Sequence, residues 1–426
     1  MALALGATDV LAVKTVTNCA DSGAGSLRSA VANAFDGDTV VFNSAAMNCS
    51  TITLATGAIK ASVPNLTING PGPQALTIDG QQRFRVLDHE GSGTLTVSGA
   101  TLRHGYIKSV NANGGCVYSK GSVVVANSVV DHCFAHAYGG FAAYGGGVFA
   151  SLDVTLSDTT ISFSKADSGP ERGSVGGGLG GGAYAHRYMT IRSSTISSSS
   201  AVVGGGVAFS STATISGTTL SNNYALFGGA LAVLAGNTHL NITDSTVSGN
   251  TARDGCGGLY LGRYRFSFPT VSISNSTVAF NTSKRMYYNG HDYAAGLCGN
   301  ISLALQSTIV SNNQVVLNGN PIAADFSVLP GTTVTGANNL IVATLAGTTP
   351  PPGTLTADPL LAPLANNASA QMTHALMAGS PAIGAGNNAA NLAYDERGPG
   401  FPRTTGGSTD IGAFQTGDRI FTNGFE

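Results

Sequence analysis

An eight-residue phrase recurs seven times in this chain and restricts its fold more than any other feature. The phrase reads apolar, any, apolar, any, then Gly, Asn or Asp, followed by small, any and apolar, and its copies span 95–102, 123–130, 154–161, 189–196, 213–220, 240–247 and 271–278. The fifth positions are Gly99, Asn127, Asp158, Ser193, Gly217, Asp244 and Asn275. All except Ser193 are residue types that tolerate a positive φ, so each fifth position predicts a left-handed bend between two short strands.

The spacing of the phrases predicts the architecture. Successive fifth positions lie 24 to 35 residues apart, which is a solenoid period, and the variation falls between phrases, as loop insertions would. We therefore predict an all-β fold, a right-handed single-stranded parallel β-helix with a short N-terminal capping helix and an irregular C-terminal cover. Phrase positions one, three and eight are expected to point inward, and coils to lie roughly 4.8 Å apart.

Two further elements recur in phase with the phrase. Gly-Gly pairs precede six strand-like runs, as at Gly146–Gly147 and Gly205–Gly206, and this periodicity indicates a column of structural turns, not phosphate-binding loops. Asparagines after several phrases predict an internal ladder of stacked side-chain amides. These asparagines are Asn222, Asn223, Asn250, Asn281, Asn312 and Asn313.

We expect three consecutive regions. Residues 1–60 form an N-terminal cap and the first strands, with a helix inside 25–35 because Leu27, Val31 and Ala34 have helical spacing and Ser26 is a suitable N-cap. Residues 61–345 form the β-helix, with the register weakening after about Asn313. Residues 346–426 form a C-terminal cover and tail.

Composition restricts the partners and the compartment. Charged residues make up 10% of the chain and the net charge is −2, so no basic field attracts nucleic acid or an anionic membrane. The six cysteines form three pairs close in sequence, Cys19 with Cys49, Cys116 with Cys133 and Cys256 with Cys298. We predict three disulfides and an oxidising compartment, with buried free thiols as the alternative. No apolar run is long enough for a transmembrane segment, and we expect a monomer.

Motifs at both ends resemble a known family. They are Asp21–Arg28 with 37–42 and 66–72 near the start, and 379–386, 395–398 and 410–414 near the end. This set is similar to the exported bacterial right-handed parallel β-helix proteins called choice-of-anchor Q, which are related to polymorphic outer-membrane-protein repeats and share the pectin-lyase-like fold. The tail 419–426 resembles a terminal segment on such proteins in Gram-negative bacteria. The resemblance implies secretion or display at a Gram-negative cell surface, and it implies no single activity.

Charged and aromatic residues gather between positions 253 and 293. Guanidinium groups bind carboxylates and tyrosine rings stack on sugars, so this strip predicts binding of an extended acidic polysaccharide; a solvated rim is the alternative. The predicted substrate-binding residues are Arg253, Arg263, Tyr264, Arg265, Arg285 and Tyr287, with Arg187 and Tyr188 from an earlier turn.

For an acidic glycan the economical reaction is β-elimination, which needs a base beside a neutralised uronate. The predicted catalytic residues are Lys284, His291 and His186 as bases and Tyr288 as acid, with Tyr188 as an alternative acid. A second group, His104 with Asp131, His132 and His136, reads as a base pair, a metal site or an ordinary loop cluster. Hydrolysis is less favoured, because the chain has no Asp-Asp pair and only four Glu.

These patterns predict an exported β-helix protein that binds an extended anionic polysaccharide and cleaves it as a polysaccharide lyase. The alternative is a non-catalytic adhesin or structural protein of the envelope. No metal ligands are assigned, because calcium repeats of the GGxGxD type are absent; a scattered calcium site is the one cofactor left open.

Overall fold

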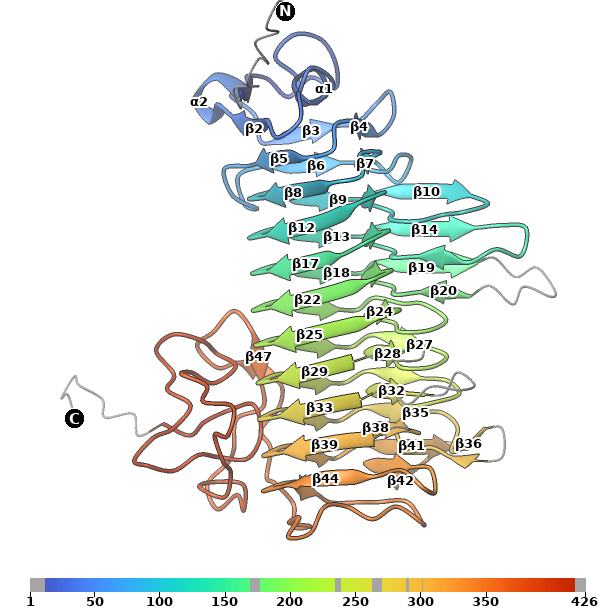
Figure 1. Ribbon diagram of the computed structural model, residues 1–426, viewed down its shortest axis with the longest axis vertical. Helices are drawn as coiled ribbons and strands as arrows, with labels where there is room; N and C mark the ends of the chain where they lie inside the picture. The colour runs from blue at the N-terminus through green and yellow to red at the C-terminus, as the bar shows by residue number, and fades with distance from the viewer. Residues whose placement is uncertain are drawn as a thin grey trace, which may run out of the picture.

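The chain winds into a column of stacked coils. The computed structural model describes residues 12–168, 177–233, 239–262, 270–288, 291–300 and 302–417. Within these residues each coil adds one strand to each of three parallel sheets, which we name sheets A, B and C (Figure 1). The predicted all-β parallel β-helix is therefore confirmed.

Each of these three sheets runs almost the whole length of the column. Sheet A contains β1 (Val13–Val16), β2 (Thr39–Phe42), β5 (Leu66–Asn69), β8 (Thr94–Ser98), β12 (Ser122–Ala126), β17 (Val154–Ser157), β22 (Tyr188–Arg192), β25 (Thr212–Ser216), β29 (His239–Thr243), β33 (Thr270–Ser274), β39 (Ser302–Gln306) and β44 (Val334–Ala337). Sheet B contains β3 (Thr51–Thr53), β6 (Thr77–Asp79), β9 (Thr101–Arg103), β13 (Val129–Asp131), β18 (Thr160–Ser162), β23 (Thr195–Ser197), β26 (Thr219–Ser221), β30 (Thr246–Ser248), β34 (Thr277–Ala279), β40 (Ile309–Ser311) and β45 (Leu340–Ile341). Sheet C contains β4 (Ile59–Ala61), β7 (Leu87–His89), β11 (Val117–Ser119), β16 (Val148–Ala150), β21 (Ala183–Ala185), β24 (Val207–Phe209), β28 (Leu231–Val233), β32 (Leu259–Leu261), β38 (Leu297–Gly299) and β43 (Phe326–Val328).

A fourth side of the column, which we name sheet D, lies between sheets B and C along the chain. It contains β10 (Tyr106–Ser109), β14 (Phe134–Ala137), β19 (Lys165–Ser168), β27 (Tyr224–Ala225), β31 (Thr251–Ala252), β35 (Thr282–Ser283), β41 (Gln314–Leu317) and the antiparallel β42 (Asn320–Ala323). Single bridges at Ser200 join its two parts. Three short pairs complete the structure, β15 (Ala143–Tyr144) with β20 (Gly178–Leu179), β36 (Tyr287–Tyr288) with β37 (His291–Asp292), and β46 (Ala365–Asn366) with β47 (Met372–Thr373).

The phrase forms one strand of sheet A, a left-handed turn and one strand of sheet B. All seven fifth positions have φ between 43° and 64°, Ser193 included. Their strands pair in register, as Leu95 with Val123 and Val123 with Val154 show. The prediction that the register weakens after about Asn313 is wrong for the strand pairing, because Val334 pairs with Leu303 and Leu340 with Ile309. These last two copies are degenerate in sequence, with Ser307 at the bend of one and Gly336 at an inward position of the other.

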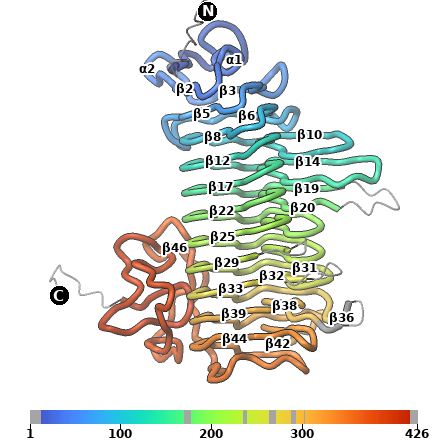
Figure 2. Tube along the Cα trace, in the orientation of Figure 1, coloured from blue at the N-terminus to red at the C-terminus, as the bar shows by residue number. Residues whose placement is uncertain are grey.

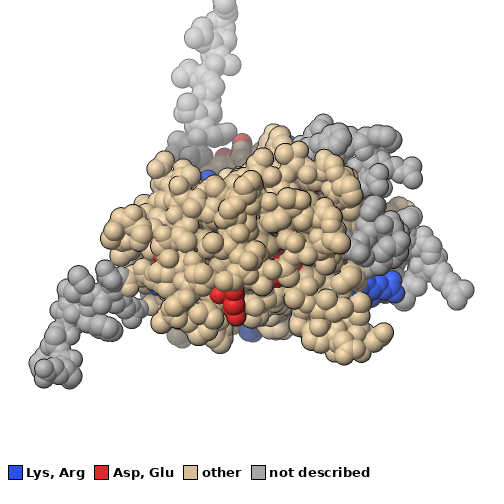
Figure 3. Space-filling model, turned by 90° about the horizontal axis from the view of Figure 1, so that it is seen from below, with Lys and Arg blue, Asp and Glu red and all other residues tan. Residues whose placement is uncertain are grey.

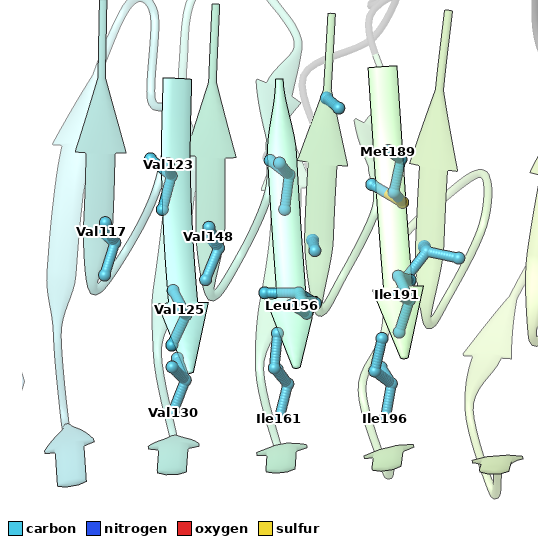
Figure 4. Packing of buried hydrophobic residues seen from close by; sticks show 14 of the residues in the cluster. Val117, Val123, Val125, Val130, Val148, Leu156, Ile161, Met189, Ile191 and Ile196 are labelled. Atoms are coloured by element: carbon cyan, nitrogen blue, oxygen red, sulfur yellow. The ribbon is translucent and has the colours of Figure 1, made fainter. Parts of the chain in front are cut away.

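The inward positions of the strands form one continuous apolar core. In sheet A the burial alternates along each strand, so that Val123 and Val125 are buried while their neighbours are partly exposed. Figure 4 shows Val125 and Leu156 from sheet A packed near Val130 and Ile161 from sheet B. Because full burial of such a side chain is worth about 1.5–3 kcal/mol, the repeated interior is the main source of stability.

A polar ladder runs inside the column beside the apolar core. Asn223, Asn250, Asn281 and Asn313 are buried, and each side-chain oxygen accepts hydrogen bonds from the preceding coil at 2.9–3.0 Å. The predicted amide ladder therefore exists, but Asn222 and Asn312 are not part of it. Those two residues are exposed and take the left-handed turn, with φ of 56° and 57°.

Helices and disulfides secure the ends and loops. Helix α1 (Leu27–Ala32) lies at the N-terminal end, and the Ser26 side chain caps it by accepting from the Ser29 amide at 3.2 Å. A second short helix, α2 (Ser44–Met47), follows β2. The predicted disulfides Cys19–Cys49, Cys116–Cys133 and Cys256–Cys298 are all present.

Residues 342–355 bridge to the last coil, as Phe326 with Thr344 and Leu340 with Leu355, and the segment 358–417 then packs against the outer face of sheet B. Thr219 Oγ1 donates to the Met372 carbonyl at 2.9 Å, and Thr277 Oγ1 accepts from the Ala413 amide at 3.0 Å. Figure 2 shows this segment, in red, on one side of the later coils and β10, β14 and β19 on the other. Charged side chains are sparse on the end of the molecule seen in Figure 3. The C-terminal cover thus leaves the sheet D side accessible.

Candidate functional site

A second column of left-handed turns lies at the corner between sheets B and D. Its members follow the phrase at a constant offset and have φ between 47° and 69°; they are His104, His132, Phe163, Ser198, Asn222, Gly249, Phe280 and Asn312. Phenylalanine is unusual in this conformation, in which histidine, Asn and Asp are more common, and strained backbone of this kind concentrates at functional sites. The corner at His104, His132 and Phe163 is therefore a candidate functional site.

Each of the two histidines pairs with a carboxylate. His132 Nδ1 lies 2.6 Å from Asp131, whose other oxygen accepts from Ser162 at 2.6 Å. His104 Nδ1 lies 3.2 Å from both oxygens of Asp79. Because Nδ1 faces a carboxylate, it carries the proton, and Nε2 is left as the basic nitrogen.

Asp79 is held in its charged form. Burial raises the pKa of Asp79, but hydrogen bonds from the Gln81 amide, Arg103 and His104 outweigh this effect and lower the pKa below its usual value. Arg103 Nε donates to this carboxylate at 2.9 Å. The His104 side of the corner is thus a fixed ionic network, whereas His132 is nearly half exposed at its side chain.

The rings of this corner stack from coil to coil. The centroids of His104 and His132 are 5.7 Å apart, and those of His132 and Phe163 are 4.8 Å apart with an interplanar angle of 20°. Phe163 is 55% exposed, so part of its ring surface remains open to a ligand. A flat apolar surface with an adjacent imidazole is suited to a sugar ring.

A cavity of about 280 Å³ opens beside this stack. It is lined by Gln82, Tyr106, His132, Phe134, Phe163 and Lys165, together with Gly105 and Cys133. The Lys165 ammonium lies 5.1 Å from the Phe134 ring centre and 2.8 Å from Asp167. We name this cavity, with its lining residues, the His132 pocket. It combines a base, a cation, a phenol and aromatic surfaces, the mixture expected of a small ligand site.

The structure brings together part of the second histidine group. His104, His132 and Asp131 meet at one corner, and His136 lies two residues beyond Phe134 on β14, with ring centres 5.5 Å apart. Sequence reasoning missed Tyr106, Phe134, Phe163 and Lys165. Phe163 was detectable, because it follows its phrase at the same offset as His104 and His132.

The predicted cationic strip lies further along sheet D. Thr251 pairs with Thr282, which places Arg253 and Lys284 at equivalent positions in neighbouring coils. Arg253 and Arg285 both contact the buried Asp254, at 2.6 and 3.1 Å. Lys284 is exposed. Two of the predicted substrate-binding cations therefore share one carboxylate.

Other predicted residues of the strip are only partly described. Tyr287 and Tyr288 form β36 and His291 belongs to β37, with Tyr288 directly opposite His291 in the hairpin. Arg263, Tyr264 and Arg265 lie outside the described residues. The catalytic role proposed for Tyr288 and His291 stays a prediction.

His186, Arg187 and Tyr188 occupy a different corner, between sheets C and A. All three are exposed. Arg187 binds Asp153 through two nitrogens at 2.8 and 2.6 Å, and its guanidinium lies 5.1 Å from the Tyr188 ring centre. Sheet C separates this corner from sheet D along the chain, so His186 and Lys284 do not form one cluster.

Two general features bear on cofactors and location. In the described ranges, no group of three or more His, Cys, Asp and Glu is placed to hold a metal ion. The disulfides fit an extracellular protein. Within the part of the chain that the structure covers, no helix is long and apolar enough to cross a membrane.

Comparisons with known proteins add little. No family model matches the chain, and no curated protein matches it. A solved structure, the crystal structure of pectate lyase Pel9A, is similar with a TM-score of 0.47 and 13% identity over 95% of this chain and 97% of that chain. Similarity at this level carries no information about the chemistry of the present chain. Membership of the choice-of-anchor Q family stays a prediction.

Proposed function

We propose that this chain binds an extended anionic polysaccharide on sheet D and cleaves it by β-elimination in the His132 pocket. The observation that carries the proposal is the composition of that pocket, in which a carboxylate-oriented histidine, a lysine and a tyrosine line one cavity with two phenylalanine rings. The disulfides support action outside the cell. Location at a Gram-negative cell surface and a monomeric state stay predictions.

The roles follow from the chemistry of each group. The Lys165 ammonium neutralises the uronate carboxylate, which acidifies the adjacent C–H. His132 Nε2 takes that proton while Asp131 holds the ring. The electron pair forms a C=C bond as the C–O bond to the leaving sugar breaks, and the Tyr106 hydroxyl supplies a proton to the departing oxygen. Phe134 and Phe163 bind the flanking sugar faces.

The test is a panel of uronic-acid polysaccharides, followed by the ultraviolet absorbance of the unsaturated ends that elimination produces. We expect one polymer to react, and His132→Asn to lower the rate about 100-fold or more, because a positioned base contributes at least this much. His239→Asn is the matched control, since His239 is exposed on β29 of sheet A. It should leave the rate unchanged.

Two outcomes would contradict the proposal. If no polymer gains absorbance, the chain is not a lyase, and binding without cleavage would favour the non-catalytic adhesin. If His132→Asn retains the full rate, the base lies elsewhere, and the hairpin of Tyr288 and His291 becomes the next candidate.

A further inference from the structure

A row of outward-facing side chains runs along sheet D from the His132 pocket. Register places the first residue of each strand in line, namely Tyr106, Phe134, Lys165, Ser200, Tyr224, Thr251, Thr282 and Gln314. The residues that follow several of them point inward and are buried, such as Ala135, Ala166 and Ala225. The row is therefore a surface feature fixed by strand pairing and not by loop conformation. We name it the sheet D row.

The row begins and ends at a cavity. Its first three members line the His132 pocket, and its last member, Gln314, lines a second cavity of about 350 Å³ with Phe280, Asn312, Pro321 and Ala323. From Lys165 to Gln314 there are five coil steps, or roughly 24 Å at the usual strand spacing. Two cavities on one straight row indicate a single long ligand.

The turn column beside the row has a matching profile. Phe163 borders the first cavity and Phe280 the second, and both are exposed, by 55% and 40%. Between them the column carries the smaller Ser198, Asn222 and Gly249. The turn column thus carries bulky side chains beside each cavity and small side chains between them. Tyr224, 40% exposed, stands in the row at this low stretch.

The charges beside the row are mainly positive. Arg253 and Lys284 directly follow the two-residue strands β31 and β35, which begin at Thr251 and Thr282, and Arg285 shares Asp254 with Arg253. At the other end, Lys165 pairs with Asp167. Among the described residues, the four cations Lys165, Arg253, Lys284 and Arg285 stand beside the three carboxylates Asp131, Asp167 and Asp254, and this positive excess favours an anionic polymer over a neutral one.

We propose that the sheet D row is an extended glycan path, in which Tyr224 and Phe280 are sugar-stacking platforms and Arg253 and Lys284 receive carboxylates remote from the His132 pocket. The anionic nature of the ligand rests on the proposed function. The path requires a chain that spans the two cavities, so affinity rises with oligosaccharide length until both are filled. Short fragments reach only one end.

The test uses size-graded oligosaccharides of polygalacturonate and of alginate, with binding to the full chain measured by titration calorimetry. Tyr224→Ala and Phe280→Asn should each weaken binding of the longest fragments roughly threefold to tenfold, the usual effect of one aromatic stacking contact, and leave the shortest unchanged. Asn is chosen at Phe280 because Asn222 and Asn312 occupy the same turn column.

Controls separate binding from folding. Tyr224→Phe keeps the ring and should bind as the unchanged chain does. Tyr394→Ala removes a comparably exposed tyrosine from the C-terminal segment and should have no effect. Equal melting temperatures show that the variants are folded.

Three results would overturn the path: affinity independent of fragment length, long-fragment binding unaffected by both Tyr224→Ala and Phe280→Asn, or no binding of either oligosaccharide series. Length-dependent binding that is sensitive to Tyr224 but comes without cleavage would support the path while refuting the lyase. Cleavage that depends on His132, together with affinity that does not depend on fragment length, would support the lyase while refuting the path.

Discussion

Two columns of left-handed turns run along the same solenoid, and they use different residues for the same backbone conformation. Between sheets A and B, the seven phrase turns carry Gly, Asn, Asp or Ser, with φ from 43° to 64°. Between sheets B and D, at nearly the same φ, the column includes His104, His132, Phe163 and Phe280. The first column follows the intrinsic backbone preference, whereas the second departs from it most clearly at Phe163 and Phe280, since histidine, like Asn and Asp, is enriched at positive φ.

The departures coincide with the cavities. His132 and Phe163 line one pocket and Phe280 lines the other, while the small members of the second column lie between them. Phe163 stacks on His132 and Phe280 lies 4.9 Å from the His374 ring of the C-terminal cover, yet both phenylalanines stay exposed by 55% and 40%, so these contacts leave ring surface available for a ligand. The comparison therefore separates turns selected for folding from turns selected for binding.

The largest effect is expected when residues of the second turn column are replaced by a residue type of the first. The double substitution of His132 and Phe163 by Asn should lower the elimination rate about 100-fold or more, because the base is lost. The free energy of unfolding should stay the same or rise, because Asn tolerates positive φ. Rate and denaturant unfolding are measured together; a large loss of stability would show that the stacked rings are structural.

The sequence predicted sheets A and B because their signal is local. Alternating apolar residues such as Val123 and Val125, followed by Asn127, define strand, face and bend within a few positions. The coil at Val334 falls inside the predicted β-helix of 61–345, but its phrase was not among the seven copies, because Gly336 replaces an inward apolar residue. Serine at position 193 shows that stacking between coils can impose the bend on a less suitable residue.

The site was predicted only in part because sheet D has little pattern of its own. Its strands bury alanines such as Ala135 and Ala166, which give a weak apolar signal. The approach of Lys165 to Phe134 depends on the register of β14 with β19, and the insertions between the phrases conceal that register in the sequence. Residue type predicted the cations near 253 and 284, but not that two of them share Asp254.

The interior beside the second column gives a pH-dependent prediction. The amide ladder ends at Asp325, which is 1% exposed and accepts from the Asn313 amide at 2.8 Å. Burial raises the pKa of Asp325 to about 6. Because the folded-state pKa exceeds the unfolded value near 4, the stabilising contribution is complete below about pH 4 and is lost as the pH rises through 6. The change is about 2–3 kcal/mol.

Asp325→Asn removes this titration. The free energy of unfolding of the unchanged chain, minus that of the variant, should fall between about pH 4 and pH 6 and stay flat above. The slope is the readout, since the Asn side chain also loses the bond that Asp325 accepts from the Ala343 amide at 2.8 Å. A constant difference across this range would contradict the raised pKa.

In the first column, Asn275 takes the left-handed turn and also contacts the C-terminal cover. Its Nδ2 donates to the Asn387 carbonyl at 3.1 Å. Asn275→Ala should destabilise the chain by about 2 kcal/mol, half from positive φ and half from the lost hydrogen bond. Asn275→Gly should lose only the contribution of the hydrogen bond, because glycine tolerates the positive φ. Equal effects of Ala and Gly in urea unfolding would show that φ is unimportant at this turn.

Gly217 offers the smallest effect and the cleanest test of backbone preference alone. Its φ is 55°, and a Cβ built on it would meet its nearest atom, the Ser193 amide nitrogen, at 3.7 Å, which is ordinary contact. Gly217→Ala therefore changes conformational preference without a clash, and should destabilise the chain by about 1 kcal/mol. Gly217→Asn should cost less, because Asn127 and Asn275 occupy the same column. If Ala and Asn were equally tolerated in urea unfolding, the residue choice in the first column would reflect side-chain contacts, and the contrast with His132 and Phe163 would lose its physical basis.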